Sequence, residues 1–389
     1  LVHPLATESV NWISGRSDPL ATFFCLLALC LMLRFIDGSS VILAWPAALL
    51  LLAGGLSKEV AVALFPAVIV FLLIYRGGDP TGRRRLPPGW RFSVCVPFLL
   101  GLFGYLYLRT SSLQQIDRGL SKVAAVTEAE SIGTRLVEMT TAFGFYVKKL
   151  WIPQPLSFAI DEVAPGYLWV GILALALLIG LVARRDLVAG LVLCLTFTIG
   201  PALLNATLRI AWTPYAERYL YLPAAFSCMT LLLAAVPPCT RFSRLPTILF
   251  VVLFLLYLPT TVQRNLLWGD TNAFAQVTYE QNSQNPSVIN MYAIALAGDE
   301  SYEKARQEFT KALRLNPDYL NTYETWARME LYVNDPLAAR DVLEPFFAGE
   351  ISTNRKIEKI ICEIESLLEN TAINRQIQPR SVGSQSLIH

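Results

Sequence analysis

The sequence has little charge and few metal-binding side chains. Only 16% of its 389 residues are charged, against about 25% in soluble domains, and 54% are hydrophobic. The formal net charge of +2 gives no indication of nucleic-acid binding. The two histidines, His3 and His389, stand at opposite ends, and the seven cysteines form no C-x-x-C pair. We therefore expect neither a metal site nor a disulfide framework, and the composition is typical of a membrane protein.

Repeated apolar runs in residues 1–262 are long enough to cross a bilayer, which requires about 20 residues. Their composition predicts an all-α fold, because a membrane-spanning segment must satisfy its backbone hydrogen bonds internally. We predict a polytopic transmembrane bundle over 1–262. Its eight spanning helices are expected at 19–36, 41–56, 60–75, 92–108, 167–183, 188–204, 218–236 and 246–262.

Arginines indicate the orientation of these helices, because cytoplasmic loops of membrane proteins are enriched in Arg and Lys. Five arginines occur in 76–91, Arg184 and Arg185 follow the fifth predicted span, and Arg241 and Arg244 follow the seventh. If these residues are cytoplasmic, the start of the chain and its polar tail lie on the periplasmic or lumenal face. The compact loops favour a bacterial inner membrane over the endoplasmic reticulum.

One segment leaves the topology open. Residues 134–152 are apolar enough for a ninth span, but they include Arg135, Glu138, Lys148 and Lys149. A ninth crossing would also move the next arginine pair out of the cytoplasm. We therefore favour an amphipathic helix that lies on the outer face.

The polar tail contains an internal repeat. In 285–317 an Asn-Pro dipeptide precedes a helical stretch, a Gly-Asp turn and a Tyr-x-x-Ala segment, and a similar unit follows in 316–346. The tetratricopeptide repeat (TPR), a helix pair of about 34 residues, has this pattern. We predict TPR helices over 263–369 that bind a protein partner, followed by a disordered tail over 370–389.

Polar residues near the outer ends of the predicted spans are candidates for a binding site, because ionisable side chains at membrane depth are costly and often functional. The segment HPLATESVNWISGRSD (3–18) precedes the first span, Ser57-Lys58-Glu59 lies between two spans, and AERYLYLP (216–223) begins another. The candidate substrate-binding residues are Glu8, Asn11, Arg16, Asp18, Lys58 and Arg218.

These motifs resemble the transmembrane-and-TPR-containing O-mannosyltransferases and their bacterial relatives, in the GT-C superfamily of glycosyltransferases. The resemblance also includes PQPLS at 153–157 and the change to TPR-like repeats. It implies a GT-C-like fold and transfer of a sugar, with mannose favoured, from a polyprenyl-phosphate carrier to an acceptor outside the cytoplasm. The superfamily's general base is an aspartate in the first outer loop, which we expect to lie upstream of Leu1. We therefore assign no catalytic residue, and we expect no cofactor beyond the lipid-linked sugar donor.

Each candidate residue also has a structural interpretation. Glu8 and Asn11 can line the binding cavity or satisfy neighbouring backbone groups at a helix end. Arg218 is the first candidate for the lipid phosphate, because a guanidinium can bind two phosphate oxygens, but it can instead pair with Glu217 or another helix. Lys58 can contact phosphate, pair with its acidic neighbour or extend to the membrane interface. Arg16 and Asp18 can pair with each other.

Two other functions remain open. A non-catalytic, membrane-anchored TPR scaffold for envelope or secretory complexes has the same organisation, but it needs no acidic pair in an outer loop upstream of His3. A transporter fits less well, because the sequence shows no inverted repeat and no matching pair of interrupted spans.

Overall fold

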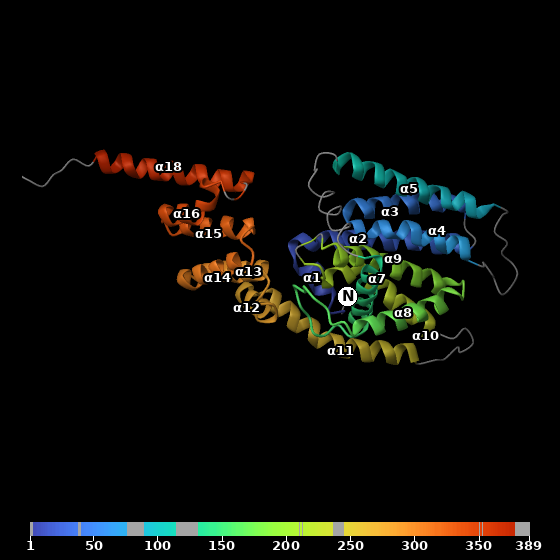
Figure 1. The fold of residues 1–389 in the computed structure, drawn as a ribbon. Helices are drawn as coiled ribbons and strands as arrows, with labels where there is room; N and C mark the ends of the chain where they lie inside the picture. The colour runs from blue at the N-terminus through green and yellow to red at the C-terminus, as the bar shows by residue number, and fades with distance from the viewer. Residues whose placement is uncertain are drawn as a thin grey trace, which may run out of the picture. The chain divides into compact units, whose positions relative to one another are not determined.

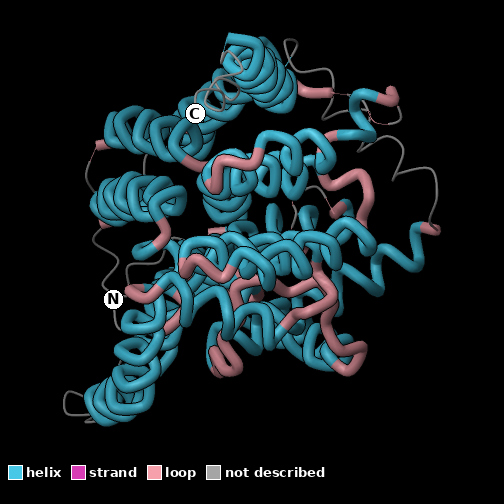
Figure 2. The backbone as a smooth tube through the Cα atoms, turned by 90° about the vertical axis from the view of Figure 1, so that its left-hand side faces the viewer, coloured by secondary structure: helices cyan, strands magenta, loops and turns pink. Residues whose placement is uncertain are grey.

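The structure is a computed structural model, and it describes residues 3–37, 40–75, 89–113, 131–209, 211, 213–235, 245–349, 351 and 353–377. This described part contains 17 α-helices and no sheet, which confirms the predicted all-α class (Figures 1 and 2). The chain divides into two compact units, Leu1–Gly269 and Asp270–His389.

The first unit consists of apolar helices joined by short 3-10 helices and loops. Figure 1 shows α3, α4 and α5 side by side, and α2 and α9 pack against the same group. The α-helices of this unit are α1 (Ala6–Asn11), α2 (Ser17–Ile36), α3 (Ala44–Ser57), α4 (Leu64–Ile74), α5 (Trp90–Leu113), α7 (Ile132–Trp151), α8 (Tyr167–Val182), α9 (Leu187–Leu208), α10 (Tyr221–Ala235) and α11 (Leu245–Trp268). Its 3-10 helices are η1 (Ile13–Arg16), η2 (Val41–Leu43), η3 (Glu59–Ala63) and η4 (Glu217–Leu220).

Four helical segments are long and apolar enough to cross a membrane, which indicates a multi-pass membrane protein. They are Ile13–Ile36, Trp90–Ser111, Leu187–Leu208 and Phe250–Trp268. Three of the other four predicted spans coincide with shorter apolar helices, α3, α4 and α8, and the fourth, 218–236, coincides with η4 and α10. The membrane crossing of these shorter helices stays a prediction, and so does the orientation of the bundle. Six of the arginines used for that orientation lie outside the described residues: Arg76, Arg83, Arg84, Arg85, Arg241 and Arg244.

The segment 134–152, predicted as an amphipathic surface helix, is the helix α7. It is not among the four long apolar segments, and its C-terminal half is buried. Helices α7 and α8 approach each other through Gly144 and Gly171. A Cβ atom on Gly144 would lie 2.0 Å from the carbonyl oxygen of Tyr167, and one on Gly171 would lie 2.1 Å from that of Thr140. The two backbones are therefore too close for any side chain at these positions.

The second unit consists of helices paired along the chain. Helix α13 packs against α14, α15 against α16, and α18 against both α15 and α16. Its helices are α12 (Thr271–Gln281), α13 (Pro286–Gly298), α14 (Tyr302–Leu315), α15 (Leu320–Tyr332), α16 (Pro336–Val342), α17 (Glu344–Phe347) and α18 (Arg355–Ile377).

An Asx-Pro pair starts α13 and α16 in the same way. The side chain of Asn285 accepts backbone hydrogen bonds at the start of α13, and Asp335 does so at the start of α16, each followed by proline. Proline is tolerated in the first turn, where its missing N–H has no helical partner. Ala293 and Ala305 are fully buried, which lets α13 and α14 approach closely.

Two predicted boundaries differ from the helices observed. Residue 262, the predicted end of the membrane domain, lies inside α11, which continues to Trp268. Helix α18 extends to Ile377, into the segment 370–389 that was predicted to be disordered, and the remaining residues of that segment are not described. Ile357, Ile360 and Ile364 bury one face of α18 in the core of the second unit. This packing anchors α18 to the second unit.

Candidate functional site

Charged side chains from distant parts of the first unit come together in what we call the charge cluster. Its members lie on α1, α2, α7, η4 and α11 and in the turn before η3. All but one are buried. The charge cluster consists of Glu8, Asp18, Lys58, Lys149, Glu217, Arg218 and Arg264.

The centre of the cluster is an ion pair between Glu8 and Arg218, whose side chains are 1% and 7% exposed. Arg218 Nη1 donates to Glu8 Oε1 at 2.7 Å, and the backbone N–H of Arg218 donates to Oε2 at 3.1 Å. A second guanidinium nitrogen donates to Thr213 Oγ1 at 3.1 Å. Both oxygens of Glu8 therefore hold the start of η4, and the pair joins segments 210 residues apart.

Two aromatic rings enclose the same guanidinium. Arg218 Cζ lies 4.8 Å from the centre of the Trp12 ring and 5.0 Å from that of Tyr219. The row of aromatic rings continues from Trp12 to Phe158 and on to Trp268, with ring centres 5.7 and 5.6 Å apart. A guanidinium is attracted to aromatic faces, more strongly when water is excluded, so Arg218 is held in one orientation by a carboxylate and two rings.

A second buried ion pair stands beside the first. Lys149 Nζ donates to Glu217 Oε1 at 2.7 Å and to the carbonyl oxygens of Pro153 and Pro155. The backbone N–H of Ser157 donates to the same Glu217 oxygen at 3.0 Å. The PQPLS motif thus wraps around this pair, and Glu217 fixes it to η4.

Asp18 and Lys58 form the most accessible part of the cluster. Lys58 Nζ lies 3.7 Å from Asp18 Oδ1, and the Lys58 side chain is 21% exposed. Ser9 Oγ donates to Asp18 Oδ2 at 3.5 Å. The charge of Arg218 also acts on Asp18, so the two pairs belong to one electrostatic site.

The structure brings four predicted site residues together: Glu8, Asp18, Lys58 and Arg218. The observed ion pairs match one of the structural alternatives and differ from two. Arg218 pairs with Glu8, which lies on another helix, and not with Glu217. Lys58 pairs with Asp18 and not with its neighbour Glu59. The ion pair of Asp18 is with Lys58, whereas Arg16 is exposed.

Asn11 lies at the edge of this region. It is exposed, and its amide donates to Asn265 Oδ1 at 2.6 Å, which ties α1 to the end of α11. Neither Asn11 nor the exposed Arg16 belongs to the buried charge cluster. Their roles in substrate binding stay predictions.

Sequence reasoning did not assign Lys149, Glu217, Arg264 or Trp12 to the site. Glu217 and Trp12 lie within motifs that were singled out, so these motifs were the signal that could have pointed to them. Lys149 is 68 residues from its partner Glu217, and no sequence signal joins the two. Arg264 lies just beyond the predicted end of the membrane domain, in the continuation of α11, where the charges of Glu217 and Glu8 act on it.

Burial changes the proton affinity of the acidic groups outside the long apolar helices. It raises the pKa of Glu8 to about 7, although the charge and hydrogen bonds of Arg218 oppose the rise. Burial also raises the pKa of Glu217, against the opposing charge of Lys149. His3 has a lowered pKa for the same reason, and its ring nitrogen Nε2 lies 3.0 Å from the carbonyl oxygen of Leu150. Glu8 can therefore take up a proton near neutral pH.

The described residues contain no group of three or more His, Cys, Asp or Glu side chains placed to hold a metal ion. No protein-family model matches the chain, and comparisons with curated proteins and with solved structures found no match. The resemblance to the O-mannosyltransferases stays a prediction, and the class that the fold defines is an all-α, multi-pass membrane protein with a second helical unit.

Proposed function

We propose that the chain belongs to a membrane glycosyltransferase that moves a sugar, with mannose the first candidate, from a polyprenyl-phosphate carrier to a protein acceptor on the non-cytoplasmic face. The observation that supports this proposal is the charge cluster. Its four cationic and three anionic side chains leave one positive charge in excess when all are ionised. A proton on Glu8 would add a second. An apolar membrane body with such a cluster is suited to a lipid phosphate.

Arg218 is the residue best placed to bind that phosphate. Its guanidinium is already oriented by Trp12, Tyr219 and Glu8, and its planar fork can bind two phosphate oxygens. The phosphate would replace the Glu8 carboxylate. Because the pKa of Glu8 is raised to about 7, Glu8 can become neutral when it loses its partner, and this lowers the cost of the exchange. Lys58, the most exposed cation of the cluster, would meet the phosphate first.

The transfer itself requires an acceptor oxygen that attacks the anomeric carbon of the sugar. The bond from that carbon to the phosphate oxygen breaks, the electron pair stays on the phosphate, and a carboxylate base takes the proton of the acceptor hydroxyl. Cations fixed beside the departing phosphate stabilise the charge that develops there. The proposal assigns this base to no residue of the chain.

The second unit would bind the polypeptide that receives the sugar. Its paired helices, the repeated Asx-Pro helix starts and the buried alanines between α13 and α14 support a TPR-like array. A cavity of about 390 Å³ between α13, α14 and α15 includes Ile294, Arg328 and Tyr332, which offer both apolar and cationic contacts to a peptide.

The proposal is tested by assaying the full-length protein with radiolabelled polyprenyl-phosphate sugars, mannose and glucose separately, in proteoliposomes. The test variant is the double substitution Glu8→Gln with Arg218→Gln, which removes the phosphate ligand without leaving a lone buried charge. We expect an activity loss of about 100-fold. The matched control is Arg184→Gln, an exposed arginine of the same unit that pairs with Asp186, and it should keep full activity. The proposal fails if wild type transfers no sugar to any acceptor polypeptide, and Arg218 is not the ligand if the double variant stays fully active.

One observation favours a non-catalytic scaffold. Glu8 pairs with Arg218 and Lys149 pairs with Glu217 inside the first unit, so these charges are already neutralised, as purely structural charges would be. In that case the double variant would leave all partner complexes intact, and wild type would bind no polyprenyl phosphate. Binding of radiolabelled polyprenyl phosphate to the purified full-length protein separates the two functions, since it does not depend on the sugar or the acceptor.

A further inference from the structure

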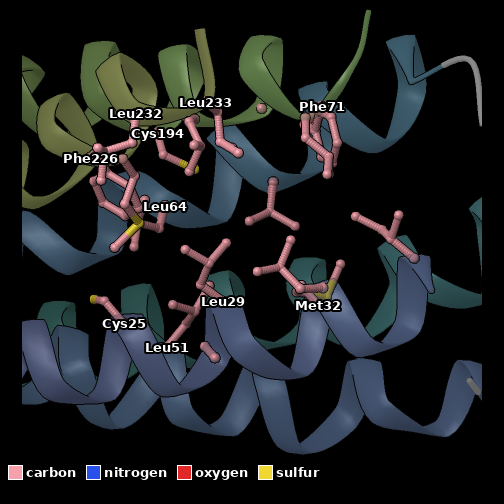
Figure 3. A pocket seen from close by; sticks show the side chains of 18 residues that line it. Cys25, Leu29, Met32, Leu51, Leu64, Phe71, Cys194, Phe226, Leu232 and Leu233 are labelled. Carbon is pink, nitrogen blue, oxygen red and sulfur yellow. The ribbon is translucent and has the colours of Figure 1, made fainter. Parts of the chain in front are cut away.

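An apolar cavity lies inside the first unit, apart from the charge cluster. Its volume is about 260 Å³, and side chains from α2, α3, α4, α9 and α10 line it (Figure 3). Every residue that lines it is apolar or carries a sulfur atom. Cys25 and Met32 of α2 and Cys194 of α9 contribute the sulfurs labelled in Figure 3. Such a cavity offers no hydrogen-bond partner to water, and apolar cavities of this kind stay dry and bind hydrocarbon.

The cavity is closed toward the charge cluster. On α2 it extends from Cys25 to Ile36, which places it about 10 to 27 Å along the helix axis from Asp18 at a rise of about 1.5 Å per residue. The intervening Ala21 is fully buried. A Cβ atom on Gly54 would lie 3.2 to 3.5 Å from Ala61, Cys25 and Ala21. No residue of the charge cluster lines the cavity.

The cavity opens sideways, between α2 and α10. Leu33, Leu232 and Leu233 line it and are 38%, 44% and 47% exposed. Because α2 belongs to one of the four segments long and apolar enough to span a membrane, these leucines face hydrocarbon and not water. An opening of this kind admits a molecule from the bilayer interior.

We propose that this cavity binds one acyl chain of a bilayer phospholipid, which enters between α2 and α10. The volume exceeds the roughly 150 Å³ of an apolar cavity that binds benzene, so it holds a longer hydrocarbon segment. The occupant is an acyl chain and not the isoprenoid chain of a donor whose phosphate sits at Arg218, because packed residues separate the two sites. The bound lipid would fill the gap between α2, α9 and α10, and this role is independent of sugar transfer.

The test uses the full-length protein in nanodiscs that contain phosphatidylglycerol with a diazirine near the end of one acyl chain. After irradiation, the labelled residues are mapped by peptide mass spectrometry. We expect several-fold more label on the cavity wall, at 25–36 and 226–233, than on α8, whose apolar side chains are largely exposed. Leu29→Phe, which fills the cavity from α2, should reduce the cavity label to the level of α8. Leu173→Phe, at a 72% exposed position of α8, is the matched control and should leave it unchanged.

Each other outcome overturns the proposal. Equal labelling of cavity wall and α8 means that no acyl chain resides there, and a label that survives Leu29→Phe lies outside the cavity. Loss of the cavity label in the presence of excess polyprenyl phosphate would assign the cavity to an isoprenoid chain. If Leu29→Phe does not fold, Met229→Phe replaces it. This substitution fills the cavity from α10 and should reduce the cavity label in the same way. Circular dichroism and gel filtration establish that each variant is folded.

Discussion

Both units of the chain use an ion pair to join helices, but the two pairs lie in different surroundings. In the first unit, Glu8 and Arg218 are 1% and 7% exposed. In the second unit, Arg306 donates to both oxygens of Glu330, at 2.8 and 2.7 Å, yet its side chain is 31% exposed. Water can thus reach the cation of the second pair but hardly that of the first.

The two units should differ in how well they tolerate the loss of one partner of an ion pair. A cation that is shielded from water must be neutralised by fixed protein groups, and removing one partner leaves an uncompensated charge. A partly exposed cation loses less, because solvent screens its charge and can take its place. We therefore expect the first unit to depend strongly on its contacts and the second to tolerate their loss.

The largest effect should come from the closest backbone contact of the first unit. Gly144→Ala would place a methyl group 2.0 Å from the carbonyl oxygen of Tyr167 and 2.5 Å from the amide nitrogen of Gly171. The methyl group would collide with backbone atoms, and no side-chain rotation can relieve this. We therefore expect a loss of folding free energy above about 5 kcal/mol and no folded protein. Yield of monodisperse protein in detergent measures this. Gly180→Ala on α8, where a Cβ would meet nothing within 4 Å, should be recovered normally.

Arg218→Ala should have the next largest effect. It leaves Glu8 buried without its ion partner, so the folded state must keep an unpaired charge or take up a proton. Because the pKa of Glu8 is already about 7, protonation limits the loss to the lower end of the about 3–5 kcal/mol that breaking a buried pair costs. Thermal unfolding in detergent should show a marked fall in Tm. Adding Glu8→Gln should recover much of the loss, because a neutral amide needs no counter-charge. If the single and double variants have the same Tm, the pair does not stabilise the first unit in the way described.

The raised pKa of Glu8 predicts a pH dependence of stability. Folded Glu8 has a pKa of about 7, against an ordinary value of 4.5, so the folded state binds its proton more tightly than the unfolded state. Stability should therefore fall as pH rises from about 4.5 to 7, by at most about 3 kcal/mol from this residue. His3, whose pKa is lowered, has the opposite sign and loses stability as pH falls below its ordinary pKa.

A comparison with Glu8→Gln isolates this contribution, because His3 is common to both proteins. The Tm of wild type relative to that of Glu8→Gln should decline between pH 5 and pH 8. An unchanged Tm difference across that range would show that Glu8 does not titrate there in the folded protein.

Sequence patterns could predict much of this architecture because its signals are local. Long apolar runs predict apolar helices whatever their neighbours are, and Glu8, Asp18, Lys58 and Arg218 are conspicuous as polar groups among apolar residues. The ion-pair partners of these residues could not be predicted in this way. The contact of Glu8 with Arg218 depends on how α1 meets η4 across 210 residues, and no local pattern encodes this. The sequence left the partner of Arg218 open between Glu217 and a residue of another helix, and it could not single out Glu8.

The end of the membrane domain was also beyond what a local sequence pattern could predict. Hydropathy falls after residue 262, and the prediction placed the boundary there. The helix nevertheless continues to Trp268, and the next helix begins where the side chain of Asp270 accepts the backbone N–H groups of Asn272 and Ala273. Hydropathy does not report where a helix is capped, and the extra turns of α11 bring Arg264 to the charge cluster.

The smallest effect should come from the second unit. Arg306→Met removes the partner of Glu330, a carboxylate that is 1% exposed but also accepts from Trp326 Nε1 at 2.8 Å. Because that hydrogen bond remains and water can enter the space left by a 31% exposed side chain, we expect a loss of about 1–3 kcal/mol. Limited proteolysis of the full chain, with cleavage sites mapped to residues 270–377, measures opening of this unit alone. Lys304→Met on the same helix, an exposed residue, should leave the cleavage rate unchanged. A loss as large as that of Arg218→Ala would show that solvent access does not distinguish the two pairs.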